Sequence, residues 1–285
     1  MMFPHRSYLF VPGDSARKQD KARGTPADAL ILDLEDSVAI ENKDAARRQT
    51  AAWLAEGAPM ARLVRINALS TGRTAEDIAA TAPGRPDGYV LPKCEGLEDI
   101  AATAALIAEA GSNAPILIIA SETVRAVRQL MRTDWAHPAL GGLAWGAEDL
   151  AADLGALSNR DAGGDWRAPF AMARTLALLA AKDAAVAAVD GPFTGLGDAE
   201  GLRREAETAF AEGFDGKLAI HPAQVPVINA AFTPTDVQLD HAQRVVDAMA
   251  GSGVASLDGQ MLDQPHLLQA QKILRLGQAR DRDAR

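Results

Sequence analysis

Eight short apolar runs recur along this chain, and each stops at a polar or charged residue. They begin near Ser7, Ala29, Arg62, Gly88, Pro115, Gly141, Ala184 and Gly213. The runs are rich in Val, Ile and Leu and are apolar throughout, which is typical of parallel strands covered on both faces. Strand–helix alternation carried eight times predicts an α/β fold, a closed TIM (β/α)8 barrel, because an open sheet would usually stop at five or six strands.

The predicted organisation is one barrel followed by an extension. Ala-rich helices are expected between the runs over residues 44–56, 97–110 and 169–181. The tail is expected to contain a helix over 236–250, a Gly/Ser hinge over 251–253 and a last helix that ends near Leu276. We therefore predict a catalytic barrel over residues 1–230 and a C-terminal helical extension over residues 231–285 that acts as a lid or in oligomerisation.

Composition and charge exclude several classes of protein. The 285 residues carry a net charge of −9 and no Lys/Arg block, so nucleic acid and membranes are not expected partners. Cys94 is the only cysteine, which excludes an intrachain disulfide and suits the reducing cytoplasm. We find no signal peptide, no membrane span and no Gly-x-Gly-x-x-Gly after a run. These features predict a cytoplasmic protein without a nucleotide-binding fold.

Acidic side chains follow several runs, at the edge where the carboxyl ends of barrel strands meet. Glu35 and Asp36 follow the second run, Glu122 the fifth and Asp149 the sixth. Mg²⁺ binds one or two carboxylates together with waters and substrate oxygens. We therefore predict that Glu122 and Asp149 bind Mg²⁺, with Mn²⁺ able to replace it. The alternatives are that both acids cap helices or form salt bridges, and that Glu148 is the ligand in place of Asp149.

Two basic residues end neighbouring runs. Arg65 emerges from an apolar Val-Arg-Ile-Asn segment, where its fixed fork of donors suits a carboxylate or enolate oxygen. The alternative is a structural ion pair with Glu35 or Asp36. Lys93 could form a Schiff base, but that chemistry needs few competing charges. A neutralising lysine is the preferred interpretation among these carboxylates.

Other polar residues at the mouth have plain structural interpretations. Asn67 and Ser121 could each form a hydrogen bond with a ligand, but helix capping is the preferred interpretation. Cys94 has no neighbouring His motif and is interpreted as a small core residue. His221 is well placed for acid–base chemistry, although packing at a strand end explains it equally well.

Two further segments carry charge that a substrate could use. After the first run, a turn over residues 10–15 leads into the densest basic stretch of the chain, with Arg17, Lys18, Lys21 and Arg23. A solvated helix face is the ordinary interpretation, but a glycine turn at a barrel mouth also suits phosphates. Asp263 lies far past the barrel in an apolar context, where a lid could carry it to the site.

Seven motifs occur in a fixed order and together resemble one family. They occupy residues 6–13, 33–38, 65–67, 91–93, 122–123, 146–150 and 213–222. Over about residues 6–275 the chain resembles the HpcH/HpaI aldolase and citrate lyase β-subunit (CitE-like) family, nearest the malyl-CoA and citramalyl-CoA lyases. The HpaI-type aldolases have a His after the Glu that follows the second strand. Here that position is Asp36, which argues against that branch.

The resemblance implies a phosphoenolpyruvate/pyruvate-type TIM barrel, a homotrimer or hexamer, that uses Mg²⁺ beside a CoA thioester. Glu122 and Asp149 match the family's metal ligands, and Asp36 matches a carboxylate that supports them. Arg65 matches the arginine on the thioester and enolate oxygen.

The resemblance also extends to the cofactor and to a catalytic acid. Lys21 matches a CoA-contacting lysine, so Phe10, Lys21 and Arg65 are the residues expected at the thioester. Asp263 is similar to the acid that the C-terminal lid of a neighbouring subunit delivers in malyl-CoA and citramalyl-CoA lyases.

The predicted activity is a Mg²⁺-dependent C–C lyase reaction. A 3-hydroxyacyl-CoA thioester such as malyl-CoA or citramalyl-CoA would be cleaved, or formed, with a 2-oxo acid and acetyl-CoA or propionyl-CoA as the other partners. The alternatives are a malyl-CoA thioesterase that uses the same site, a citryl-acyl-carrier-protein lyase β subunit, and a catalytically silent CoA-binding barrel.

Overall fold

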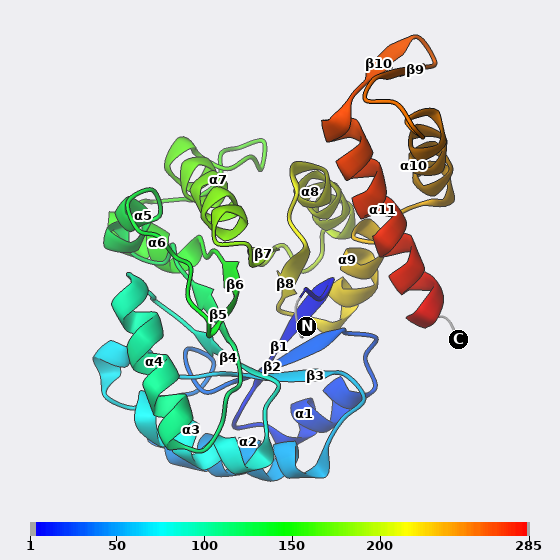
Figure 1. Ribbon diagram of the computed structural model, residues 1–285. Helices are drawn as coiled ribbons and strands as arrows, with labels where there is room; N and C mark the ends of the chain where they lie inside the picture. The colour runs from blue at the N-terminus through cyan, green and yellow to red at the C-terminus, as the bar shows by residue number, and fades with distance from the viewer. Residues whose placement is uncertain (1–3, 284–285) are drawn as a thin grey trace. The chain divides into compact units, whose positions relative to one another are not determined.

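The computed structural model describes residues 4–283 and contains a closed barrel of eight parallel strands (Figure 1). The strands are β1 Ser7–Pro12, β2 Ala29–Asp33, β3 Ala61–Arg65, β4 Gly88–Leu91, β5 Ile116–Ile119, β6 Leu140–Ala144, β7 Ala187–Asp190 and β8 Gly216–Ala219. Each strand pairs with the next in sequence, and β8 closes the barrel by pairing with β1. The predicted TIM barrel is confirmed.

Two strands begin later than predicted. The seventh run is expected from Ala184, but Ala184 is the C-cap of the preceding helix, and Ala185 lies in the turn that follows with a left-handed φ of 55°. The eighth run was expected from Gly213, which instead ends the preceding helix at φ 110°. Apolar residues at a helix end look like strand residues in sequence, so periodicity alone could not separate them.

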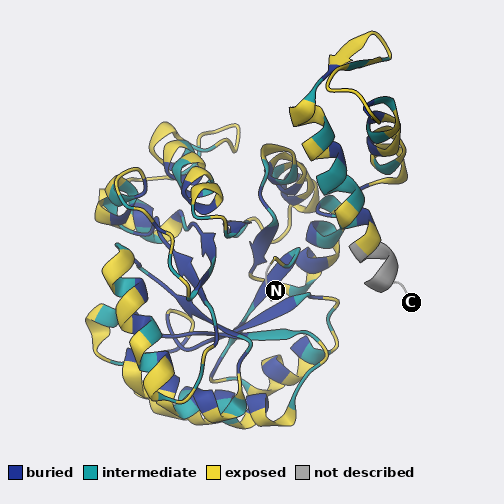
Figure 2. Cartoon of the chain, in the orientation of Figure 1, coloured by how far each residue is buried: buried dark blue, intermediate teal, exposed yellow. Residues whose placement is uncertain are grey.

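The barrel is surrounded by helices that bury one face each (Figure 2). They are α1 Ala16–Arg23, α2 Lys43–Glu56, α3 Thr74–Thr81, α4 Leu97–Glu109, α5 Val124–Gln129, α6 Glu148–Leu154, α7 Ala168–Asp183 and α8 Ala199–Glu212. Short 3₁₀ segments lie at η1 Ile40–Asn42, η2 Leu69–Thr71, η3 Ala82–Gly84 and η4 Pro222–Gln224, and α9 spans Val225–Ala231. The strands are apolar on both faces because one face fills the barrel and the other packs on this helical layer.

The barrel interior is filled by alternate strand residues. Its packed cluster comprises Tyr8, Ala29, Ile31, Leu63, Val90, Leu117, Ile119, Ala144, Ala187, Val189 and Leu218. Every strand supplies at least one member, so the strand ends are held by a single continuous core. Side chains at those ends are therefore presented by a rigid scaffold.

The chain divides into two compact units, the first ending at Asn229 and the second beginning at Ala230. The second unit contains α10 Asp236–Ala248, the antiparallel hairpin of β9 Ala255–Leu257 and β10 Gln260–Leu262, and α11 Gln264–Asp283. Its own small core is Ala242, Val245, Met249, Leu262 and Ala270. That the extension acts as a lid or in oligomerisation stays a prediction.

The second unit differs in detail from the sequence-based expectation. The hairpin was not predicted, because its strands are only three residues long. The last helix was expected to end near Leu276 but continues to Asp283. Within residues 4–283, no helix combines the length and the apolar character that crossing a membrane would require.

Candidate active site

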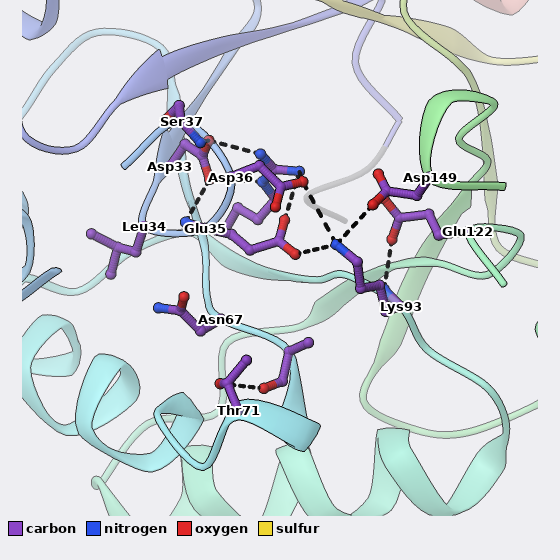
Figure 3. Close-up of polar contacts among 12 residues, drawn as sticks. Asp33, Leu34, Glu35, Asp36, Ser37, Asn67, Thr71, Lys93, Glu122 and Asp149 are labelled. Atoms are coloured by element: carbon purple, nitrogen blue, oxygen red, sulfur yellow. Dashed lines mark hydrogen bonds and ion pairs between the residues drawn. The ribbon is translucent and has the colours of Figure 1, made fainter. Parts of the chain in front are cut away.

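Five neighbouring strands, β2 to β6, bring charged side chains together at their carboxyl ends. Figure 3 shows Glu35, Lys93, Glu122 and Asp149 pointing toward one another from different strand ends. Arg65, the last residue of β3, joins them through an ion pair between its Nη1 and Glu35 Oε2 at 2.9 Å. The sequence-based expectation that these residues share one face of the barrel therefore agrees with the structure.

Arg65 is held by Asp33, a carboxylate for which the sequence pattern indicates no role. Its Nε and Nη2 donate to Asp33 Oδ1 and Oδ2, each at 2.7 Å, in a bidentate arrangement. Although burial opposes ionisation of Asp33, the Arg65 guanidinium lowers the pKa of that carboxyl below its ordinary value. The guanidinium lies 4.7 Å from the centre of the Phe10 ring. Asp36 is more distant, at 3.8 Å, and its side chain is 55% exposed.

Lys93 joins three of the carboxylates. Its Nζ lies 2.6 Å from Glu35 Oε1, 3.1 Å from Asp149 Oδ1 and 3.6 Å from Asp36 Oδ2. Burial would lower the pKa of Lys93, but the hydrogen bond and charge of Glu35 outweigh it and raise the pKa above its ordinary value. The amine is therefore an ion-paired ammonium, which favours the neutralising role over the Schiff-base role.

Glu122 is the least compensated acid of the site. It is 4% exposed, and among residues 4–283 the group that donates to its carboxylate is the backbone N–H of Lys93, at 2.6 Å. Lys93 adopts a left-handed backbone conformation at φ 51° there. Burial, followed by the charges of Glu35 and Asp149, raises the pKa of Glu122 to about 8. A bound cation would remove this penalty.

The excess of negative charge at the site also favours a bound cation. Five carboxylates surround the two cations Arg65 and Lys93, namely Asp33, Glu35, Asp36, Glu122 and Asp149, so three negative charges are left over when all are ionised. In the described part of the chain, no group of three or more His, Cys, Asp or Glu side chains is arranged to hold a metal. A Glu122–Asp149 pair fits Mg²⁺, which takes one or two carboxylates and completes its shell with water and substrate.

Glu148, the alternative ligand, contacts the loop between α6 and α7. It is exposed, and its Oε1 accepts a hydrogen bond from Asn159 Nδ2 at 2.8 Å. Asp149 instead contacts Lys93 and acts electrostatically on Glu122. The geometry therefore favours Asp149 as the second oxygen donor.

The residues interpreted as structural are engaged in structural contacts. Neither Ser121 nor Asn67 caps a helix as predicted, because the N-caps of α5 and α3 are Thr123 and Arg73. Ser121 Oγ instead accepts from the Gly146 N–H at 3.0 Å, and Asn67 Nδ2 donates to Asp77 at 2.7 Å. His221 is exposed, and its Nδ1 accepts from the N–H of Ala223 at 3.1 Å, which caps η4. The cap favours the structural interpretation of His221 over the acid–base one.

Cys94 is buried and free. Burial raises the pKa of its thiol to about 12. This agrees with the interpretation as a small core residue.

The basic segment separates into structural and exposed members. Arg23 donates to Gly57, pairs with Glu56 at 2.5 Å and stacks on Trp53 at 4.3 Å, so it ties α1 to α2. Lys21 is exposed on the last turn of α1, and Arg17 and Lys18 are exposed near the start of the same helix. A phosphate contact by Lys21 stays a prediction.

Asp263 belongs to the second unit, between β10 and α11. Its Oδ1 lies 2.5 Å from His266 Nδ1, and its side chain is 41% exposed. The structure leaves this carboxylate accessible, and its catalytic role stays a prediction.

A comparison with sequence models of protein families decides the family. Residues 6–222 match the sequence model described as HpcH/HpaI aldolase/citrate lyase. This chain belongs to the HpcH/HpaI aldolase/citrate lyase family. Residues 178–280 of this family member also match a model described as a C–C bond lyase of the TIM-barrel fold.

Relatives of this family member cover nearly its whole length. A (3S)-malyl-CoA thioesterase of Cereibacter sphaeroides is 36% identical over 97% of this chain and 95% of its own. A citrate lyase subunit beta-like protein of Mycobacterium tuberculosis is 37% identical over 94% of both chains. The crystal structure of protein CitE from M. tuberculosis, in complex with magnesium, acetoacetate and coenzyme A, aligns with a TM-score of 0.83 and 34% identity over 97% of this chain and 99% of that one.

Proposed function

We propose that this chain is a Mg²⁺-dependent C–C lyase of CoA thioesters. The substrate would be a 3-hydroxyacyl-CoA such as malyl-CoA or citramalyl-CoA, and the products a 2-oxo acid and acetyl-CoA or propionyl-CoA. The observation that carries this proposal is the buried, undercompensated Glu122 beside Asp149 and Arg65. The CitE structure with magnesium, acetoacetate and coenzyme A supports it, because a related barrel holds the same kinds of group.

Glu122 and Asp149 would hold the metal ion. When bound, Mg²⁺ would polarise the hydroxyl and carboxylate oxygens of the substrate and lower the pKa of the hydroxyl. Mn²⁺ accepts the same oxygen ligands and is expected to replace it. Lys93 borders Asp149 and would offset part of the negative charge that remains, while Asp36, 3.6 Å from Lys93 Nζ, would support the site from beside that lysine.

Arg65 would stabilise the charge that develops on the thioester oxygen. Asp33 engages two of the five N–H groups of the guanidinium and Glu35 Oε2 lies 2.9 Å from Nη1, so the N–H groups not directed at these two acids would bind a substrate oxygen. The bidentate contact also fixes the side chain before substrate arrives, which is the condition under which such a donor lowers a barrier most.

The remaining roles concern the proton and the cofactor. Asp263 would protonate the enolate carbon during cleavage and remove a proton from the acyl-CoA during condensation. It would do so in a homotrimer or hexamer, from the extension of a neighbouring chain. Phe10 and Lys21 would contact the CoA moiety, with Phe10 lying against Arg65.

A thioesterase is the second candidate, and the Cereibacter relatives named (3S)-malyl-CoA thioesterase favour it. The same site would bind the thioester, and water would attack its carbonyl carbon, so that the C–S bond breaks and free CoA leaves with the intact hydroxy acid. A citrate lyase β subunit, the name of relatives from Leuconostoc mesenteroides and Escherichia coli, would act on an acyl-carrier protein instead. A silent CoA-binding barrel would turn over none of these thioesters.

One experiment separates these functions. The purified chain is incubated with malyl-CoA, citramalyl-CoA or citryl-CoA and Mg²⁺, and products are resolved by mass spectrometry. A 2-oxo acid with acetyl-CoA is the expected result. Free CoA with the intact hydroxy acid would identify a thioesterase, and no product with any of these CoA thioesters would contradict both the CoA-thioester lyase and the CoA thioesterase. The Glu122→Gln variant serves as the inactive control.

A further inference from the structure

A fully buried carboxylate, Asp190, connects the ends of three barrel strands. Asp190 ends β7 and is 0% exposed. Its Oδ1 accepts from Trp145 Nε1 at 2.7 Å and from Arg174 Nε at 2.8 Å, and its Oδ2 accepts from Lys217 Nζ at 2.7 Å. Lys217 lies on β8 and is also 0% exposed. None of these residues belongs to the acidic cluster around Glu122.

From Lys217 the contacts continue and return to Trp145. Lys217 Nζ donates to Glu205 Oε1 at 2.8 Å, and Glu205 Oε2 lies 2.5 Å from Arg160 Nη2. The Arg160 guanidinium stacks 3.4 Å from the centre of the Trp166 ring. Trp166 in turn packs edge-on against Trp145, with ring centres 4.9 Å apart. These residues form a closed ring of contacts that joins β6, β7, β8, α8 and the loop between α6 and α7.

The turn that carries Asp149 begins at this ring. Trp145 follows β6 directly, and Asp149 stands four residues later, in the first turn of α6. Between them the Gly146 N–H donates to Ser121 Oγ at 3.0 Å. A Cβ on Gly146 would lie 3.1 Å from Glu122 Cγ, a contact so tight that the Glu122 side chain would have to shift by a few tenths of an ångström. The turn is therefore fixed on one side by β5 and on the other by the ring.

The loop between α6 and α7 adds a second attachment. Asn159 Nδ2 donates to Glu148 Oε1 at 2.8 Å, next to Asp149. The neighbouring Arg160 is the ring member that pairs with Glu205. The ring thus constrains the turn before Asp149 through Trp145 and the first residue of α6 through the loop.

A gain in folding stability does not by itself explain why these charged residues are buried together. A buried ion pair contributes little net stability compared with apolar packing of the same volume. What buried hydrogen-bonded charges supply is a fixed direction, and here the direction is that of the Trp145 indole. A residue that fixes a metal ligand in place changes metal affinity by about 10- to 100-fold when it is altered.

We propose that Trp145, Asp190 and Lys217 are positioning residues for the metal site, because they hold the turn that carries Asp149 against Glu122. This inference rests on the proposed metal-binding role of Glu122 and Asp149. It adds residues that contact neither the metal ligands' oxygens nor the predicted substrate groups.

The test compares two Trp→Phe variants of the same chain. Trp145→Phe removes the indole N–H that donates to Asp190. Trp135→Phe is the matched control, because Trp135 is 2% exposed, precedes β6 at its opposite end and has a buried Nε1 without a hydrogen-bond partner among the described residues. Mn²⁺ affinity is measured by isothermal titration calorimetry, and thermal unfolding is measured in EDTA. We expect Mn²⁺ binding about tenfold weaker or more in Trp145→Phe and unchanged in Trp135→Phe.

The outcomes distinguish this inference from the proposed function. Equal Mn²⁺ affinity in Trp145→Phe and wild type, with only a lower melting temperature, would contradict the positioning role and show that the ring serves stability alone. Absence of Mn²⁺ binding to wild type would overturn the metal site and the positioning role together. If Trp145→Phe does not fold, Arg160→Gln opens the ring at its more exposed side, with Arg203→Gln on α8 as control. Weaker Mn²⁺ binding in Arg160→Gln alone supports the inference, and equal binding contradicts it.

Discussion

Arg65 and Asp33 face each other through two parallel N–H···O contacts, each 2.7 Å long, across the paired ends of β3 and β2. Both residues are nearly inaccessible, with side-chain exposures of 11% and 2%. The contact orients the guanidinium so that its remaining N–H groups lie beside Glu35 and the rest of the acidic cluster. The fork geometry of Arg65 is thus determined before any ligand binds.

Arg65→Lys should therefore be far from conservative. A lysine cannot form the bidentate contact with Asp33, and it offers one point charge in place of a fixed fork. We expect kcat to fall by about 10² or more, as for the loss of an oxyanion donor. Steady-state kinetics with malyl-CoA would measure this. The matched control is Arg62→Lys, since Arg62 lies near the opposite end of β3 and pairs with Asp87; a near-normal kcat in Arg65→Lys would leave Arg65 with a structural role only.

Turnover should depend on a divalent cation held by two carboxylates. We expect Glu122→Gln and Asp149→Asn to abolish turnover and Mn²⁺ binding, because each removes an anionic oxygen ligand. Glu109→Gln is the control, since Glu109 is exposed at the last residue of α4. Calorimetry and a chelator titration would measure both effects. Full activity in excess EDTA is the result that rules this prediction out.

The raised pKa of Glu122 predicts a pH dependence with a definite sign. In the metal-free chain its pKa is about 8, against an ordinary value of 4.5. The folded state then binds more protons than the unfolded state between these values, so metal-free stability should fall as pH rises from about 4.5 to 8. Mn²⁺ must displace the proton, so its affinity should rise by about tenfold per pH unit below pH 8. Thermal unfolding in EDTA and calorimetry at pH 6, 7 and 8 would measure these trends, and both should vanish in Glu122→Gln.

Cys94 should be unreactive in the folded chain. Burial raises the pKa of its thiol to about 12, and the thiolate is the reactive form. We expect no reaction with a thiol-specific disulfide reagent at pH 8 in the native state and one thiol per chain after unfolding in guanidinium. Rapid labelling of native protein, with thermal unfolding unchanged, would show that the thiol is accessible after all.

Asp263 should act on a site in another chain. Asp263→Asn and Glu122→Ala chains are each expected to be inactive alone. Mixed and allowed to exchange subunits, they should regain part of the activity, because some sites would combine an intact metal pair with an intact Asp263. Subunit exchange is verified independently by native mass spectrometry. No regained activity in exchanged mixtures would mean that Asp263 acts within its own chain or has no role.

The barrel and its active face could be predicted from the sequence for a direct physical reason. Parallel strands covered on both faces must be apolar throughout, and their carboxyl ends must meet at one edge. Charged residues that follow such runs, such as Glu122 and Asp149, therefore converge whatever the details of packing. The hairpin of β9 and β10 could not be predicted in this way, since strands of three residues carry too little pattern.

By itself, the sequence determined the strand–helix repeat, the face that carries charge and the family to which the chain belongs. Only the tertiary structure decided which carboxylate pairs with which basic side chain. Arg65 is fixed by Asp33, 32 residues away, and Lys93 by Glu35, 58 residues away. The reason is physical: such pairs depend on strand register and on the direction of each side chain at a strand end, and neither quantity is contained in local periodicity.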